Sequence, residues 1–177
     1  MRIFYFILLA FLLLPQTAKA QISFDPGEGC LNVADFAVGK GLDDGHGSVF
    51  SVQYLHERFI SEQFCLGAGV GYSYLGGYEF SALPLFFSAH YFFLDQRFSP
   101  FVNLRTGMYL PLGPKGKLSG INLYVAPSAG LKVHLAPHFG ILASVDYNGY
   151  LVKGSDSLKM ATALGVSLGL CFQIPGW

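Results

Sequence analysis

The sequence predicts an all-β protein, an eight-stranded antiparallel up-and-down transmembrane β-barrel. Three observations lead to this fold class. Large apolar residues alternate with small or polar ones along most of the chain, which is the period-two pattern of a strand with two different faces. Short turn-like stretches separate the alternating segments. The chain is 52% hydrophobic and only 12% charged, about half the usual charged fraction of a soluble domain, so it needs a membrane or an unusually large interior.

The first 20 residues have the pattern of a signal peptide. Arg2 supplies a positive charge, residues 3–14 form an apolar run, and residues 18–20 (Ala-Lys-Ala) give a small-x-small cleavage site. The apolar run is shorter than the roughly 20 residues that a membrane-spanning helix needs. We therefore expect residues 1–20 to be a cleaved signal peptide and residues 21–177 to form one exported barrel domain.

The clearest alternation lies in residues 64–74, FCLGAGVGYSY, where one phase is bulky and apolar and the other holds Cys, Gly and Ser. Seven other segments alternate in the same way with varying regularity. In chain order, strands are expected at residues 31–39, 48–57, 64–74, 81–93, 100–110, 122–135, 139–151 and 158–174.

The strands differ in how cleanly they alternate. The first, residues 31–39, is the least regular. In residues 81–93, Phe86 and Phe92 interrupt the small and polar phase, whereas the strands of the C-terminal half alternate more cleanly. A proline removes one donor from a strand ladder. We therefore interpret Pro84 and Pro127 as bulge sites or strand ends.

The residue types of the two phases indicate which face meets the surroundings. A soluble lipocalin-like barrel would keep its apolar face inside and carry a strongly polar exterior. Here the second phase is mostly Gly, Ser, Ala and Asn, which suits the narrow interior of an eight-stranded barrel. The bulky phase suits a lipid-facing band, with Tyr and Phe near the strand ends. Closure into a barrel also pairs every backbone group, as hydrocarbon requires.

The last strand and one central hairpin carry a family resemblance. Residues 167–174, SLGLCFQI, are similar to the polar-x-Gly-x-x-hydrophobic-x-aromatic signal that the barrel-assembly machinery reads, with Ile174 where an aromatic residue is usual. Residues 83–109 resemble a hairpin of the same family. The chain thus resembles the small outer-membrane β-barrel proteins of Gram-negative bacteria, the OmpA/OmpX-like "outer membrane protein beta-barrel domain" group. The resemblance implies an assembly signal at Ser167, Gly169, Phe172 and Ile174.

The resemblance also implies a location and partners. It places the chain in the cell outer membrane as a monomer among outer-membrane lipid and lipopolysaccharide, with the barrel-assembly machinery and periplasmic chaperones as partners during biogenesis. Nucleic acid is not expected as a partner, because 11 basic and 11 acidic residues give zero net charge. The family includes structural barrels, adhesins, small-solute channels and a few lipid enzymes, and a shared fold does not decide among these roles.

An even number of strands predicts that both mature termini lie on the periplasmic side. The outer loops would then centre on four short segments, and their shortness weakens an adhesin role. Arg58 and Arg97 fall near the inner turns. The expected outer loops are residues 41–47, 75–79, 111–119 and 152–157.

Charged residues in the inward phase predict a plugged lumen. Arg105, Lys132 and Asp146 fall on three consecutive strands at similar counts from the inner rim, and Asp35 can join them from the first strand. Charges in so narrow a space persist when they are paired, whereas charges that line a water path separately need a wider lumen. We expect this lumen polar network to close a barrel with a structural or interaction role. The alternatives are a narrow channel for small solutes and a lipid A-modifying enzyme.

The enzyme alternative has candidate residues in two expected outer loops. A catalytic triad needs a nucleophile, a base and an acid within hydrogen-bond reach. The two loops lie at the same end of the barrel, but their composition is also ordinary for loops. We therefore expect no enzymatic activity and no catalytic residue. The residues weighed are His46 with Asp43, Asp44 and Ser48, and Ser155, Asp156 and Ser157.

Histidine spacing gives no zinc pattern, so no metal and no cofactor are expected. His90 and His134 are interpreted as hydrogen-bonded lumen residues, and His56 and His138 as residues of periplasmic turns.

The three cysteines, Cys30, Cys65 and Cys171, map near the periplasmic rim. Cys30 and Cys171 would lie on neighbouring strands after closure but on opposite faces. Disulfide geometry is restrictive, and a disulfide stays open.

Overall fold

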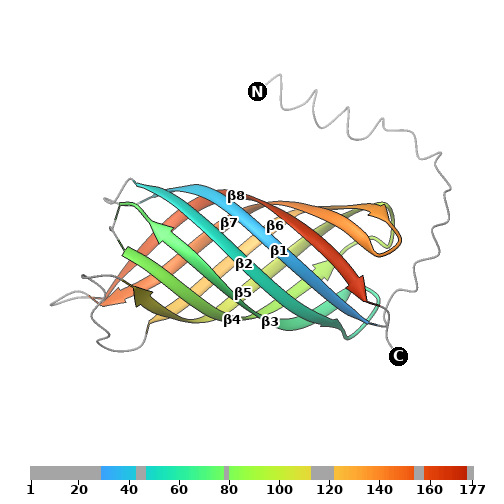
Figure 1. The fold of residues 1–177 in the computed structure, drawn as a ribbon, viewed down its shortest axis with the longest axis horizontal. Helices are drawn as coiled ribbons and strands as arrows, with labels where there is room; N and C mark the ends of the chain where they lie inside the picture. The colour runs from blue at the N-terminus through green and yellow to red at the C-terminus, as the bar shows by residue number, and fades with distance from the viewer. Residues whose placement is uncertain (1–28, 43–46, 78–79, 113–121, 154–157, 175–177) are drawn as a thin grey trace, which may run out of the picture.

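The computed structural model is a closed barrel of eight antiparallel strands, each paired with the next, with β1 pairing β8 (Figure 1). The structure describes residues 29–42, 47–77, 80–112, 122–153 and 158–174. The strands are β1 (Cys30–Gly41), β2 (Ser48–Phe59), β3 (Phe64–Leu75), β4 (Phe80–Phe92), β5 (Phe98–Leu112), β6 (Leu123–Ala136), β7 (Phe139–Lys153) and β8 (Leu158–Ile174). The predicted fold class and all eight strand positions are confirmed. In the part of the chain that is described, no helix has the length and apolar character needed to cross a membrane.

One end of the barrel carries the short turns. Cys30 at the start of β1 pairs with Ile174 at the end of β8, and residues 60–63, 93–97 and 137–138 connect strands at this same end. We call it the inner end and the opposite end the outer end, following the expected orientation; it lies on the right in Figure 1. The predicted signal peptide and most of the predicted outer-loop residues lie outside the described residues.

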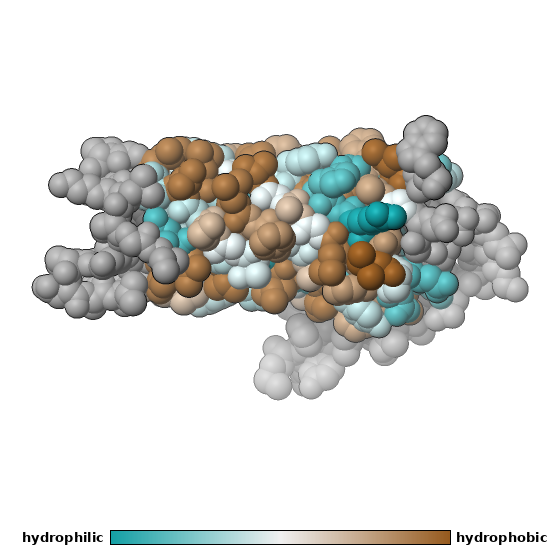
Figure 2. Space-filling model, turned by 90° about the horizontal axis from the view of Figure 1, so that it is seen from below, coloured by the Kyte–Doolittle hydropathy of each residue, from teal (hydrophilic) through white to brown (hydrophobic). Residues whose placement is uncertain are grey.

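The two phases of each strand face as predicted. In β3, Leu66, Val70, Tyr72 and Tyr74 are exposed on the outer wall, whereas Ser73 is buried. The other strands follow the same rule, and Figure 2 shows hydrophobic side chains over much of the wall, with hydrophilic ones gathered nearer the inner end. The bulky face is therefore the outer wall and the small, polar face lines the lumen.

The two phenylalanines that interrupt the polar phase of β4 fill the lumen. Phe86 and Phe92 are 3% and 4% exposed, although a phenylalanine on a barrel strand would ordinarily suit the lipid-facing wall. Gly69 on β3 provides the room for one of them, because a Cβ atom at this position would lie 2.6 Å from the Phe86 ring. A small residue on one strand thus admits a large ring from the next.

The interpretation of Pro84 and Pro127 as bulges or strand ends is wrong. Both lie inside strands, and the ladders of β4 and β6 with β5 run unbroken past them. Pairing is interrupted beside each proline on the other side, with β3 and β7, and resumes in the same register. The N–H and C=O of one residue point to the same neighbouring strand, so a proline weakens a single ladder. The register shift between β6 and β7 lies instead at His134 and Ala136.

Candidate functional site

The centre of the lumen holds a buried charged cluster, which we call the middle layer. Nη1 of Arg105 lies 2.9 Å from Oδ2 of Asp35, and Nη2 lies 3.8 Å from Oδ1 of Asp146. Arg105 also donates from Nη1 to Oε1 of Gln53 at 2.8 Å and from Nε to Oδ1 of Asn103 at 3.0 Å. All five side chains are buried. One guanidinium thus links four strands, as a group with five N–H donors in a planar fork can do.

Lys132 does not meet this cluster, and its predicted place beside Arg105 and Asp146 is corrected. In the β-sheet register Asp146 faces Ser128, whereas Lys132 faces Ser99 and Leu142. Ser128 and Lys132 are four positions apart on β6, about 13 Å at the usual rise per residue. Equal residue counts from the rim do not give equal depth in a barrel whose strands tilt and stagger.

The inner third of the lumen holds a second charged pair, Glu57 of β2 and His90 of β4. Nδ1 of His90 lies 2.7 Å from Oε2 of Glu57, and both side chains are buried. The His90 ring stacks on Phe92 with centroids 5.5 Å apart. Asn103 donates to Ser88 at 2.8 Å beside this pair and so connects it to the middle layer. We call this group the inner layer.

Glu57 is a lumen residue that the sequence analysis missed. It lies four positions after Gln53, in the same inward phase, but at the last position of the expected strand. The structure extends β2 to Phe59, which gives Glu57 a paired position opposite Leu31 and Gly67. Strand phase was the signal that could have found it.

The outer half of the lumen is filled by aromatic rings. Phe86, Tyr109, Tyr124 and Tyr150, which we call the outer layer, are all buried. Ring centroids are 5.6 Å apart for Phe86 and Tyr124, 5.1 Å for Tyr124 and Tyr150, and 5.4 Å for Tyr109 and Tyr150. Such separations are typical of packed aromatic pairs. The lumen is therefore occupied by rings above the charged middle layer.

Tyrosine hydroxyls tie the outer layer to the polar residues around it. Tyr124 accepts a hydrogen bond from Gln53 at 3.0 Å and donates to Asn148 at 3.1 Å. Tyr150 donates to Ser73 across the barrel at 2.8 Å. Because Gln53 also accepts from the guanidinium of the middle layer, the two layers form one connected network.

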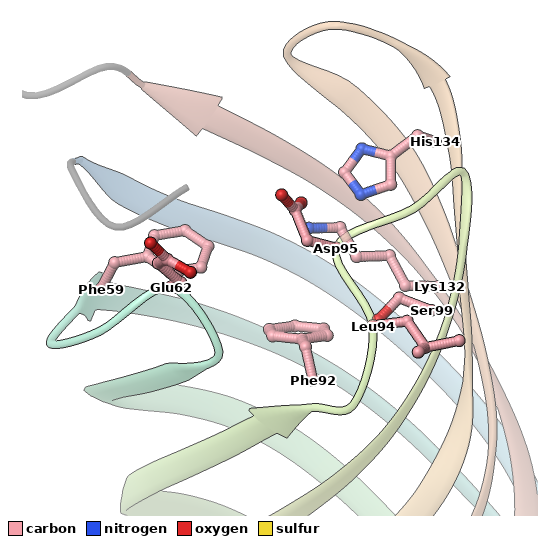
Figure 3. A pocket seen from close by; sticks show the side chains of 8 residues that line it. All are labelled: Phe59, Glu62, Phe92, Leu94, Asp95, Ser99, Lys132 and His134. Atoms are coloured by element: carbon pink, nitrogen blue, oxygen red, sulfur yellow. The ribbon is translucent and has the colours of Figure 1, made fainter. Parts of the chain in front are cut away.

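A small pocket opens at the inner mouth of the barrel (Figure 3). It holds about 20 Å³, enough for one water molecule. Lys132 extends from β6 towards the β4–β5 connection that carries Asp95, and its Nζ lies 4.7 Å from the centre of the Phe92 ring. Partial burial, and then the nearby Glu62 carboxylate, raise the pKa of Asp95, while Lys132 opposes the rise. The lining residues are Phe59, Glu62, Phe92, Leu94, Asp95, Ser99, Lys132 and His134.

The cysteines and histidines take different positions. Cys65 and Cys171 are buried, Cys30 is half-buried, and all three are free thiols. His90 is a hydrogen-bonded lumen residue and His134 lines the inner pocket. His56 lies on β2 rather than in a turn, where it faces outward and contacts Asn32 at 2.7 Å. In the described ranges, no group of three or more His, Cys, Asp or Glu residues is placed to hold a metal ion.

The predicted assembly-signal residues all lie on β8. Ser167 and Gly169 are buried and face the lumen, whereas Phe172 and Ile174 are each 52% exposed on the outer wall. Of the residues weighed for catalysis, Ser48 is exposed at the start of β2. The others, residues 43–46 and 155–157, lie outside the described residues.

The closed wall, its apolar exterior and its filled, polar lumen define a small eight-stranded membrane β-barrel. Three similar solved structures belong to this class. They are Neisserial surface protein A (TM-score 0.67, 17% identity, 82% of this chain and 97% of that chain), the outer-membrane enzyme PagL (0.56, 18%, 80% and 99%) and OprG from Pseudomonas aeruginosa (0.54, 10%, 85% and 98%). At these identities the likeness shows the fold alone. No protein-family model matches the sequence, and no curated protein does so significantly.

Proposed function

We propose that this chain is an integral protein of the Gram-negative outer membrane with a structural or interaction role, and that its lumen is closed to solutes. The observation that carries the proposal is the contact between Arg105 and Asp35, which joins β5 to β1 through the centre of the barrel. A side chain that reaches across the lumen to a charged partner leaves no open path beside it. The inner and outer layers close the lumen again below and above this level.

Burial at low dielectric supports a stable plug over a gate. Breaking a buried ion pair leaves an uncompensated charge, which costs about 3–5 kcal/mol. Opening the middle layer would break contacts to Asp35, Gln53 and Asn103 together. Thermal opening should therefore be rare, and the barrel should serve as a rigid scaffold in the membrane.

Planar-bilayer recording on the refolded protein tests the closed lumen. The wild type should show no steady conductance. A variant that carries Arg105→Ser, Asp35→Ser and Phe86→Ala removes the central ion pair and one outer ring, and it should conduct if it refolds. This variant shows that the recording can detect an open eight-stranded barrel. Steady conductance from the wild type would instead establish the narrow-channel alternative.

The lipid A-modifying alternative has a separate test. The similar fold of the enzyme PagL does not transfer an activity, because function depends on a site and not on a fold. Expression in a Gram-negative host, followed by mass spectrometry of its lipid A, would reveal any change in acyl chains or head groups. We expect an unchanged lipid A profile, with the protein recovered from the outer-membrane fraction.

A further inference from the structure

Two buried oxygen atoms beside the middle layer have no hydrogen-bond partner in the protein. They are Oδ2 of Asp146 and Oγ of Ser128, and each has almost no accessible surface. The two residues are direct partners in the β6–β7 register and both face the lumen. A buried polar atom without a partner is costly, and two such atoms facing one another point to a shared ligand.

The charges of the middle layer are also unbalanced. Asp35 and Asp146 supply two carboxylates, whereas Arg105 supplies one guanidinium that lies closer to Asp35, at 2.9 Å, than to Asp146, at 3.8 Å. Lys132 lies several residues nearer the inner end. The layer therefore holds one net negative charge in a low-dielectric interior, where an uncompensated charge is strongly unfavourable.

More oxygen atoms surround the same point. Ser144 donates a hydrogen bond to Oδ1 of Asp146 at 3.1 Å, and its hydroxyl lies 2.6 Å from that of Ser167. Pro127 precedes Ser128 and has no N–H to give to Tyr147, the residue across the interrupted part of the β6–β7 ladder. The wall formed by β6, β7 and β8 is thus rich in oxygen at the position where the positive charge is missing.

We propose that the Asp146 carboxylate and the Ser128 hydroxyl bind a small monovalent cation, sodium, inside the lumen. Carboxylate and hydroxyl oxygens are the ligands that hard cations prefer. One positive charge balances the layer, and one ion contacts both partnerless oxygens. The two oxygens do not hydrogen-bond to one another, so a proton on Asp146 would leave Ser128 without a partner. A bridging water would satisfy both atoms but would leave the charge. The inference is independent of conductance, because the ligands are present in a plugged or an open barrel.

Thermal unfolding of the refolded protein in detergent tests this proposal. Sodium chloride is replaced stepwise by choline chloride at constant ionic strength, since choline is too large for the site. A ligand that binds only the folded state raises its stability with the logarithm of ligand concentration. Above the dissociation constant, the unfolding midpoint should rise by roughly 3 °C for each tenfold increase in sodium.

Variants locate the effect. Ser128→Ala and Asp146→Asn should each abolish the dependence on sodium. Ser51→Ala, which removes another buried lumen hydroxyl from β2, should keep the full dependence and is the matched control. If Asp146→Asn does not refold, Ser128→Ala decides the question, because it changes no charge.

Two results would overturn the proposal. One is a wild-type midpoint that is equal in sodium and choline, which would leave Asp146 to a proton or to water. The other is a sodium dependence in Ser128→Ala as large as that in Ser51→Ala, which would place the ion elsewhere.

Discussion

Arg105 on β5 and Asp35 on β1 form an ion pair at 2.9 Å across the barrel lumen. The strands that carry them are four apart in either direction around the ring of eight. The pair therefore joins opposite walls, and its geometry depends on closure of the barrel between β1 and β8. Neighbouring strands are already held by their ladders, so this contact adds a constraint that no ladder supplies.

Removal of the guanidinium should destabilise the barrel strongly. Arg105→Met leaves Asp35 buried without its partner, which costs about 3–5 kcal/mol. Adding Asp35→Asn should recover part of that loss, so the double variant should be less destabilised than the sum of the single variants. Urea unfolding in lipid vesicles measures all three. Strict additivity would show that the contact carries no coupling energy.

The direction that β7 side chains face gives a second prediction. Val145 is 52% exposed on the outer wall, and an arginine at the bilayer midplane costs about 2–4 kcal/mol on a barrel's lipid face. Val145→Arg should therefore impair folding into lipid vesicles by this amount. Ile174→Arg, on the same wall at the inner rim, should cost only about 0–1 kcal/mol.

The neighbouring position serves as the contrast in facing. Ser144→Arg points inward, next to Asp146 and Ser167. It should fail by crowding the lumen in detergent as well as in lipid. If Val145→Arg folded into vesicles like the wild type, the assignment of the outer wall would be wrong.

The inner layer should contribute stability through Glu57 and His90. Glu57→Ala removes an acceptor 2.7 Å from the buried imidazole, and loss of a buried charged partner costs about 3 kcal/mol. Glu57→Gln keeps a carbonyl acceptor at the same place and should cost about 1 kcal/mol. Chemical unfolding measures both variants. Equal stability of the two would mean that the hydrogen bond contributes nothing.

The fold could be predicted from sequence because alternation is a local property. Each strand of the type seen in residues 64–74 states its two faces by itself, and hydrocarbon then requires closure. Depth in the lumen is different, since it depends on register between strands that are remote in sequence. Lys132 shows this, because its residue count from the rim matched that of Asp146 while its register did not.

The aromatic filling of the lumen could not be predicted for a second reason. Tyr124 and Tyr150 lie in the inward phase, yet large rings on barrel strands are also typical of the lipid-facing wall. Whether a ring fits inside depends on small residues elsewhere, as Gly69 makes room for Phe86. The phase alone therefore indicated a bare interior where the structure has rings.

Asp95 at the inner mouth gives the last prediction, a dependence of stability on pH. Burial and the Glu62 carboxylate raise the pKa of Asp95 above its ordinary value of 3.8. The folded state then holds a proton that the unfolded state has released, so stability falls as pH rises from 3.8 through the raised pKa. Asp95→Asn removes this loss. It should unfold at a higher temperature than the wild type at neutral pH and at the same temperature below pH 3.8. Adding Glu62→Gln should reduce the gain, because it removes one cause of the raised pKa. An Asp95→Asn variant that unfolds earlier than the wild type at neutral pH would show that attraction to Lys132 outweighs burial.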